Sequence, residues 1–176
     1  MHRLFVAIRP PEAVIDTLFD TMEGLDGARW QSDLQLHLTL RFIGEVERPQ
    51  AEDIALALSR LSFTPFAVKV EGVGSFDTKG RSNSIWAGIA PSRELSDLQA
   101  RVEQACRRAG AAPETRKFLP HITLARINAA SGDIAPWLLR HSDLRLPPFT
   151  VRHFLLCESH LSEHGASYED IARFPA

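Results

Sequence analysis

The segment LQLHLTLRF at residues 34–42 decides the fold, because it reads as a β-strand with one unusual face. Successive side chains of a strand point to opposite faces, so the leucines share one face while His37 and Thr39 share the other. A row of leucines is suited to a buried core. An imidazole and a hydroxyl side by side indicate that the opposite face meets something polar.

A second copy of the pattern, LPHITLAR, stands at residues 119–126, where His121 and Thr123 are again followed by leucine. The chain has 7 histidines, and random placement predicts only about 0.3 His-x-Thr occurrences. His37 and His121 are 84 residues apart, close to half of the 176-residue chain. This spacing indicates an internal duplication, in which two similar lobes face each other across a groove and each contributes one motif.

The composition is that of one globular domain without a strong charge excess. The chain is 44% hydrophobic and 24% charged, with a formal net charge of -2, so we expect residues 1–176 to form a single bilobal domain. A protein that coats long nucleic acid usually has a basic excess, so any nucleic-acid contact is expected to be short and local. Cys106 and Cys157 belong to no CxxC or metal-binding pattern and are expected to be buried thiols.

The sequence carries no secretion or membrane signal that we recognise. The N-terminal segment RLFVAI is too short for the apolar region and cleavage site of a signal peptide. No apolar run approaches the roughly 18 residues of a membrane span. We therefore expect a cytoplasmic protein without a membrane partner.

Strand and helix patterns are intermixed along the chain, without the steady βαβ repeat of a doubly wound sheet. The expected strands cover 3–9, 35–43, 66–73, 84–90, 119–126, 149–158 and 168–174, and the expected helices cover 11–24, 51–61, 95–109 and 134–141. The polar segment FDTKGRSN at 76–83 is expected to be a loop. The pattern predicts an α+β fold with two antiparallel sheets related by a pseudo-twofold axis, helices on the outside and a central active-site groove.

Two histidines without a nucleophile are suited to acid–base catalysis at neutral pH. One neutral imidazole can take a proton from water while a protonated imidazole gives a proton to a leaving oxygen. This arrangement is what in-line hydrolysis of a phosphodiester requires. The hydroxyls of Thr39 and Thr123 can bind the non-bridging phosphate oxygens and stabilise the charge that develops there.

Two arginines follow the motifs closely, and a guanidinium matches the geometry of a phosphate. Arg41 lies four residues after His37, so strand alternation predicts that both share a face. Arg126 lies five residues after His121 and reaches the same site only if the strand twists or bulges. For each arginine, a solvated salt bridge is an equally good interpretation.

A base beside the phosphate would stack on an aromatic ring. Phe42, Trp30 and Trp86 are candidates, although alternation places Phe42 on the leucine face and core packing is the commoner role of such residues. Basic side chains that could steer an RNA backbone, or could simply be solvated turn charges, are Lys79, Arg81, Arg116 and Lys117. The other five histidines show no paired pattern and are not catalytic candidates.

The doubled His-x-Thr-Leu motif resembles that of the 2H phosphoesterase superfamily. The closest likeness is to the RNA 2′,3′-cyclic phosphodiesterases, also called 2′-5′ RNA ligases. It covers nearly the whole chain, and the segments that carry it are RLFVAI, LHLTLRFIGEV, the PF…V-G-x-F segment at 65–76, IWAG at 85–88, FLPHITLAR and a late FTV strand.

The resemblance implies a bilobal α+β fold with a groove and no metal, and hydrolysis of a terminal 2′,3′-cyclic phosphate of RNA to a 2′-phosphate. By position, His37 would be the proton donor to the 3′-oxygen and His121 the proton acceptor for water, while Thr39 and Thr123 hold the phosphate. The sequence alone is symmetric in these roles. The reverse reaction would form a 2′-5′ linkage without a nucleotide cofactor, because the strained ring carries the activation.

The expected partner is RNA with a 2′,3′-cyclic phosphate end, tRNA fragments included, and the protein is expected to act as a monomer. Two alternatives remain open. One keeps the groove and changes the substrate to ADP-ribose cyclic phosphate or 2′-5′ oligonucleotides. The other is a non-catalytic module whose histidines bind a metal or an RNA end, although zinc sites usually add ligands at short spacing and neither motif has any.

Overall fold

The computed structural model describes all residues from 1 to 176. The strands are β1 (His2–Ile8), β2 (Arg29–Trp30), β3 (Leu38–Val46), β4 (Phe66–Val68), β5 (Val70–Thr78), β6 (Arg81–Ile89), β7 (His121–Arg126), β8 (Phe149–Val151), β9 (His153–Ser162) and β10 (Gly165–Pro175). The helices are α1 (Glu12–Phe19), α2 (Arg48–Ser59), α3 (Arg93–Arg108) and α4 (Ala135–Arg140), and the 3₁₀ turn is η1 (Asp33–Gln35). Helices and strands are mixed along the chain, and the expected α+β class is confirmed.

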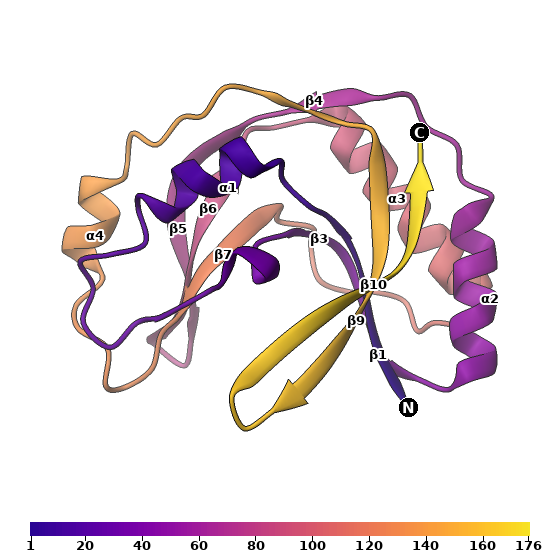
Figure 1. The fold of residues 1–176 in the computed structure, drawn as a ribbon, viewed down its shortest axis with the longest axis horizontal. Helices are drawn as coiled ribbons and strands as arrows, with labels where there is room; N and C mark the ends of the chain where they lie inside the picture. The colour runs from indigo at the N-terminus through magenta and orange to yellow at the C-terminus, as the bar shows by residue number, and fades with distance from the viewer.

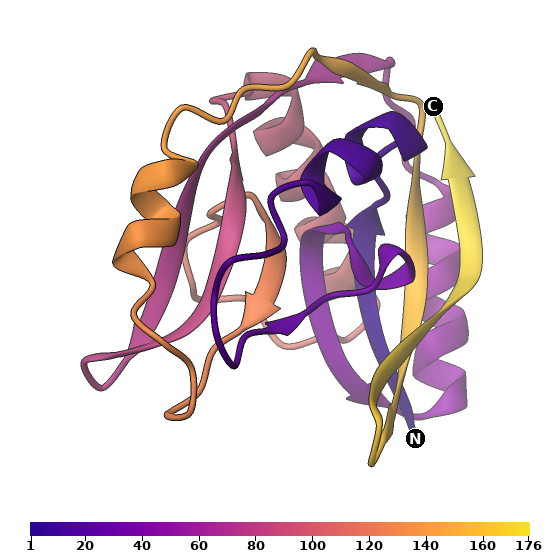
Figure 2. The ribbon, with the colours of Figure 1, turned by 60° about the vertical axis from the view of Figure 1, so that its left-hand side comes forward.

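The fold is built on one large antiparallel sheet with the strand order β10-β9-β1-β3-β7-β6-β5. Strands β4 and β8 form a small second sheet. Only the pair Leu38–Ile122 joins β3 to β7. We call β10-β9-β1-β3 the first lobe and β7-β6-β5 the second lobe. Figure 2 shows the strands of the two lobes side by side, with the second lobe on the left. The seam between the lobes is therefore the boundary between the two strands that carry the His-x-Thr motifs.

The chain order reveals two repeats that exchange strands. The first repeat runs β1-α1-β3-α2-β4-β5, and the second runs β6-α3-β7-α4-β8-β9. In the sheet, β5 of the first repeat pairs with β6, and β9 of the second repeat pairs with β1. Each lobe is thus completed by a strand from the other repeat, while each lobe still contributes one His-x-Thr motif, as expected.

The main core lies between the sheet and the helices, and all four helices contribute to its cluster of 34 buried residues. On α3 the buried side chains recur every three or four positions, which is the spacing of one helix face: Leu95, Leu98, Val102, Ala105 and Cys106. The Ser92 side chain accepts a hydrogen bond from the Leu95 amide at 3.2 Å and caps this helix. The opposite face of the first lobe has a small cluster of its own: Phe5, Ala7, Leu155 and Cys157.

Several segments differ from the sequence prediction, among them the expected strand at 66–73, which is divided between β4 in the small sheet and β5 in the large sheet. The expected loop at 76–83 is the end of a long hairpin, in which only Lys79 and Gly80 turn the chain, both with positive φ (53° and 77°). A two-residue turn of this kind matches the twist of the flanking strands, so polar residues remain in the strands. The expected strand at 149–158 is divided between β8 and β9. The segment β9-β10 forms a long hairpin that projects from the sheet (Figure 1).

The helices are short or amphipathic. None of them is long and apolar enough to cross a membrane.

Candidate active site

The two motifs meet in one groove at the seam between the lobes. The cavity has a volume of about 470 Å³, and His37, Thr39, His121 and Thr123 all line it. Neither threonine hydroxyl has a hydrogen-bond partner within the protein. Both hydroxyls are therefore free to bind a ligand, and the expected convergence of two imidazoles and two hydroxyls is what the structure shows.

Each imidazole is held in the same way. The Nδ1 atom of His37 lies 2.6 Å from the Gln35 carbonyl oxygen, and the Nδ1 atom of His121 lies 2.6 Å from the Leu119 carbonyl oxygen. A carbonyl can only accept, so Nδ1 must donate its proton in both residues. This contact fixes the tautomer of each ring and leaves Nε2 as the nitrogen that can exchange a proton in the groove.

Aromatic rings enclose both imidazoles and lower their basicity. His37 lies 4.9 Å from Phe5 and 5.3 Å from Tyr168 between ring centroids. His121 lies 4.8 Å from Phe76, and its other aromatic neighbour is Trp86 at 5.9 Å. Burial lowers the pKa of His37 to about 4 and also lowers the pKa of His121, because a charged ring loses its hydration there. Both shifts favour the neutral form of the imidazole at pH 7.

A β-bulge in each motif strand decides which later residue faces the groove. Thr39 lies opposite Ala7 and Arg41 opposite Val6, so Leu40 is the extra residue of β3. This bulge reverses the alternation, which turns Phe42 into the groove and Arg41 onto the core face. Phe42 is 38% exposed and lines the cavity. The expectation that Phe42 faces the core is wrong, and so is the expectation that Arg41 shares the face of the histidine.

The second motif bulges at the equivalent position. Thr123 lies opposite Trp86 and Ala125 opposite Ile85, so Leu124 is the extra residue of β7. The sequence predicted that Arg126 would reach the groove only if the strand twisted or bulged. The bulge at Leu124 does bring Arg126 to the groove. Arg126 and Phe42 each follow the histidine by five residues and occupy matching places in the two lobes.

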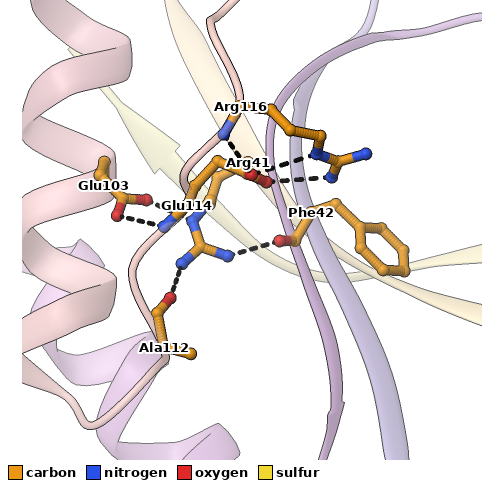
Figure 3. A network of polar contacts seen from close by, with 6 residues as sticks. All are labelled: Arg41, Phe42, Glu103, Ala112, Glu114 and Arg116. Carbon is orange, nitrogen blue, oxygen red and sulfur yellow. Dashed lines mark hydrogen bonds and ion pairs between the residues drawn. The ribbon is translucent and has the colours of Figure 1, made fainter.

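Arg41 is a buried structural residue, with only 4% of its side chain exposed. Its guanidinium donates hydrogen bonds to the Glu103 carboxylate and to the carbonyl oxygens of Ala112 and Phe42 (Figure 3). These contacts occupy both edges of the guanidinium. The structure therefore does not bring Arg41 to a bound phosphate, although its motif position suggested such a contact.

The groove is positively charged although the whole chain is not. The lining includes three arginines, Arg3, Arg116 and Arg126, and no aspartate or glutamate. Arg126 lines the same cavity as both histidines, and after burial its positive charge is a further cause of the lowered pKa of His37 and His121. Such a concentration of positive charge favours a small anion at the centre of the groove.

Several groove residues carried no sequence signal. Phe5 lies in an apolar strand that reads as core, and Tyr168, the only tyrosine of the chain, is supplied by β10 from the distant C-terminus. Phe76 lies in the segment that was expected to be a loop. Of the other aromatic candidates, Trp30 packs on Trp137 at 6.1 Å in the core. It does not line the groove, although it pairs with Ala125 of the second motif strand. Strand exchange brings these residues together, and no local sequence pattern indicates which strands are exchanged.

Groups that could hold a metal gather outside the groove. Glu158, His160 and Glu169 offer ligand atoms within 4.8 Å of one another, but Ser159 and Leu161 line the groove. Alternation on β9 therefore points the cluster to the opposite face. The two thiols are both buried, and burial raises the pKa of Cys157 to about 12, so neither cysteine is an available nucleophile.

Comparison with known proteins identifies relatives along the whole chain. A family model described as LigT like Phosphoesterase matches residues 8–86 and again 88–168. An RNA 2′,3′-cyclic phosphodiesterase of Archaeoglobus fulgidus is 29% identical over 98% of this chain and 99% of its own length. An RNA 2′,3′-cyclic phosphodiesterase of Aeropyrum pernix is 32% identical over 79% of this chain and 81% of its own length.

Solved structures share the fold. A Thermus thermophilus protein superposes with a TM-score of 0.83 at 25% identity, covering 98% of this chain and 97% of its own. E. coli LigT in complex with 3′-AMP superposes with a TM-score of 0.78 at 25% identity, covering 99% and 97%.

The first family match runs from the end of β1 through most of β6 and the second from the end of β6 into β10, so each match contains one His-x-Thr motif. They confirm the family that the doubled motif indicated and, with it, the expectation of an enzyme. The chain belongs to the LigT-like phosphoesterases of the 2H superfamily.

Proposed function

We propose that this protein is an RNA 2′,3′-cyclic phosphodiesterase that hydrolyses a terminal cyclic phosphate to a 2′-phosphate by two-histidine acid–base catalysis. The observation that carries the proposal is the pair of imidazoles with matching Nδ1 contacts, one from each lobe, in a groove lined by arginines and free of carboxylates. The names of the sequence relatives support the same activity.

The proposed reaction places the cyclic phosphate between the lobes. His121 takes a proton from water through Nε2 as the water oxygen attacks phosphorus. His37 gives a proton to the departing 3′-oxygen, so the P–O3′ bond breaks and the 2′-phosphate remains. Because the two histidines come from opposite lobes, the attacking and leaving oxygens can be in line. Thr39 and Thr123 would donate hydrogen bonds to the non-bridging oxygens, where charge grows in the transition state.

Substrate binding must also supply the proton that His37 donates. Burial holds the pKa of His37 to about 4, so the ring by itself is neutral at pH 7. An anionic phosphate beside the ring favours the protonated form and raises its pKa. We therefore propose that the substrate anion enters the groove together with a proton.

The proposal is tested by one hydrolysis assay on an oligonucleotide that ends in a 2′,3′-cyclic phosphate, with EDTA present throughout. We expect the wild type to be active, and we expect His37→Ala and His121→Ala each to lose about 10²–10⁴-fold in kcat, the usual contribution of a general acid or base. The product should be the 2′-phosphate and not the 3′-phosphate. Full activity of either variant would contradict the two-histidine mechanism.

The matched control is His160→Ala. His160 lies on the opposite face of β9 and is half-exposed, with its Nε2 atom 3.1 Å from Glu169. This variant should keep wild-type activity. Thermal unfolding of all three variants separates a lost catalytic group from a lost fold.

We further propose that a 5′-hydroxyl can take the place of water as the attacking group. Its oxygen attacks phosphorus while His121 takes its proton, the P–O3′ bond breaks as His37 gives a proton to the 3′-oxygen, and a 2′-5′ linkage results. The same groove geometry serves both attacking groups, and opening of the strained ring supplies the free energy. Incubation with an excess of an oligonucleotide bearing a 5′-hydroxyl should yield a joined product. Its absence at millimolar acceptor would remove this part of the proposal.

A further inference from the structure

Arg116 stands at one end of the groove in a fixed orientation, although its side chain is 76% exposed. It lines both the central cavity and a second hollow of about 650 Å³ that adjoins it. Its Nε and Nη2 atoms donate to the Glu114 carboxylate at 3.1 and 3.0 Å, and its backbone amide donates to the same carboxylate at 3.0 Å. The guanidinium has five N–H donors, so Nη1 and one proton of Nη2 remain free for a phosphate.

A chain of contacts connects this arginine to the core (Figure 3). The Glu114 amide donates to Glu103 on α3 at 3.0 Å, and Glu103 is also paired with the buried Arg41. Arg41 in turn binds the Ala112 carbonyl oxygen, at the start of the loop 111–120 that leads to His121. The loop contains no helix or strand, so these contacts set its position. Because Arg116 is already ordered, it loses little conformational freedom when it binds an anion.

The groove has another end, which is unsuited to a charged backbone. Behind His37 it adjoins a smaller cavity of about 190 Å³ with a mostly apolar lining that includes Phe5, Leu155 and Cys157, and with Asp170 in its wall. A phosphodiester there would lose its hydration without gaining a cation beyond Arg9. The second hollow is more open and presents Arg116 and Lys117 beside the carboxylates of Asp77 and Glu114. Of these two ends it is the better path for an RNA strand whose cyclic end lies between the histidines, and this path passes Arg116.

We propose that Arg116 binds the backbone phosphate next to the terminal nucleoside, so that the enzyme prefers RNA ends of two or more nucleotides to cyclic mononucleotides. This inference rests on the proposed hydrolysis of cyclic phosphates and specifies its substrate class. Glu114, Glu103 and Arg41 are positioning residues in this account, since they act through Arg116. The pKa of Glu114 is lowered to about 2, mainly by its hydrogen bonds to Arg116, so the carboxylate holds the arginine at any working pH.

The test compares two substrates: adenosine 2′,3′-cyclic phosphate and the dinucleotide of adenosine that ends in the same ring. For each enzyme we measure the ratio of kcat/KM for the dinucleotide to kcat/KM for the mononucleotide. The wild type should favour the dinucleotide by at least about tenfold, the usual effect of one charge-assisted hydrogen bond. The ratio should fall to near one in Arg116→Gln, and its dependence on salt should weaken in the same variant.

Two further variants separate positioning from bulk charge. Glu114→Gln removes a negative charge beside the groove, so electrostatic attraction alone predicts a higher ratio, whereas loss of the fixed orientation predicts a lower one. We expect the lower ratio. The matched control is Arg93→Gln on α3, which removes an equal charge from a side chain that is 93% exposed and distant from the groove, and it should leave the ratio unchanged.

The outcomes can be told apart. If the wild type cleaves both substrates with equal kcat/KM and Arg116→Gln behaves like the wild type, the inference is overturned while the proposed activity stands. If Glu114→Gln raises the ratio, the proposal that Glu114 acts by positioning Arg116 is wrong. If the wild type cleaves neither substrate, the proposed function fails and this inference fails with it.

Discussion

At the scale of single residues, the groove uses burial to prepare its catalytic groups. The two imidazoles are bound at Nδ1 by backbone carbonyls and packed on aromatic rings, and they share one cavity with Arg126. Burial and the arginine both favour neutral rings. A neutral pair can receive an anionic substrate and one proton together, whereas a pair that is already charged would bind phosphate tightly in the ground state. Tight ground-state binding does not accelerate a reaction.

This arrangement predicts different pH dependences for kcat/KM and kcat. The reaction needs one protonated and one neutral histidine, and kcat/KM reports the free enzyme. The pKa of His37 is about 4 and that of His121 lies below 6.5, so the singly protonated form declines as the pH rises above the higher of the two values. We expect kcat/KM to be greatest in mildly acidic buffer and to fall about tenfold per pH unit above pH 6.5.

The profile of kcat should peak at a higher pH, because the bound phosphate raises the pKa of both rings. Rates measured from pH 4 to 9 at limiting and at saturating substrate check both statements. A kcat/KM that stays constant from pH 5 to 9 would contradict the prediction, provided that chemistry limits the rate.

At the scale of elements, the sequence predicted which residues meet in the site better than it predicted the contacts around these residues. Two His-x-Thr motifs were enough to place four groove residues, because alternation holds within the three residues of each motif. Alternation failed beyond Thr39, since the bulge at Leu40 reverses the faces of Arg41 and Phe42. A bulge adds one residue without a marked sequence signature, so strand periodicity cannot locate it. The bulge at Leu124 has the same effect, and it brings Arg126 into the groove.

The cross-strand pair of Gly74 on β5 and Trp86 on β6 supports His121. The indole ring of Trp86 covers Gly74, and a methyl group at residue 74 would overlap that ring. We expect Gly74→Ala to destabilise the protein by about 1–3 kcal/mol, the usual cost of overpacking. The displaced ring would let water reach His121, so the pKa of His121 should rise toward its ordinary value.

Denaturant unfolding and NMR titration of the histidine ring protons measure both effects. The control is Gly132→Ala, where φ is not in the left-handed region and the nearest atom to an added methyl group would be 3.7 Å away. That variant should match the wild type in both measurements. An unchanged His121 titration in Gly74→Ala would show that Trp86 does not shield the ring.

At the scale of the whole molecule, strand exchange makes the two lobes depend on each other. The first lobe needs β9 beside β1, and the second lobe needs β5 beside β6. The small sheet of β4 and β8 also joins one repeat to the other. The duplication was visible in the sequence as two motifs 84 residues apart, but the exchange was not, because strand partners at long range leave no local pattern. We propose on this basis that residues 1–176 act as one bilobal unit.

The two repeats should therefore fold only together. The chain can be divided at the exposed turn between Lys79 and Gly80, which breaks no strand. Fragment 1–79 would lack the partner of β1 on one side and would keep β5 without the β6 and β7 strands of its lobe, and fragment 80–176 would leave the apolar side chains of β9 uncovered. We expect each fragment alone to show no cooperative thermal unfolding, and an equimolar mixture to recover the circular dichroism spectrum of the intact chain and its phosphodiesterase activity. The intact chain is the control. A cooperative transition in either fragment alone would show that a lobe can complete its sheet without the exchanged strand, and the one-unit account would then be wrong.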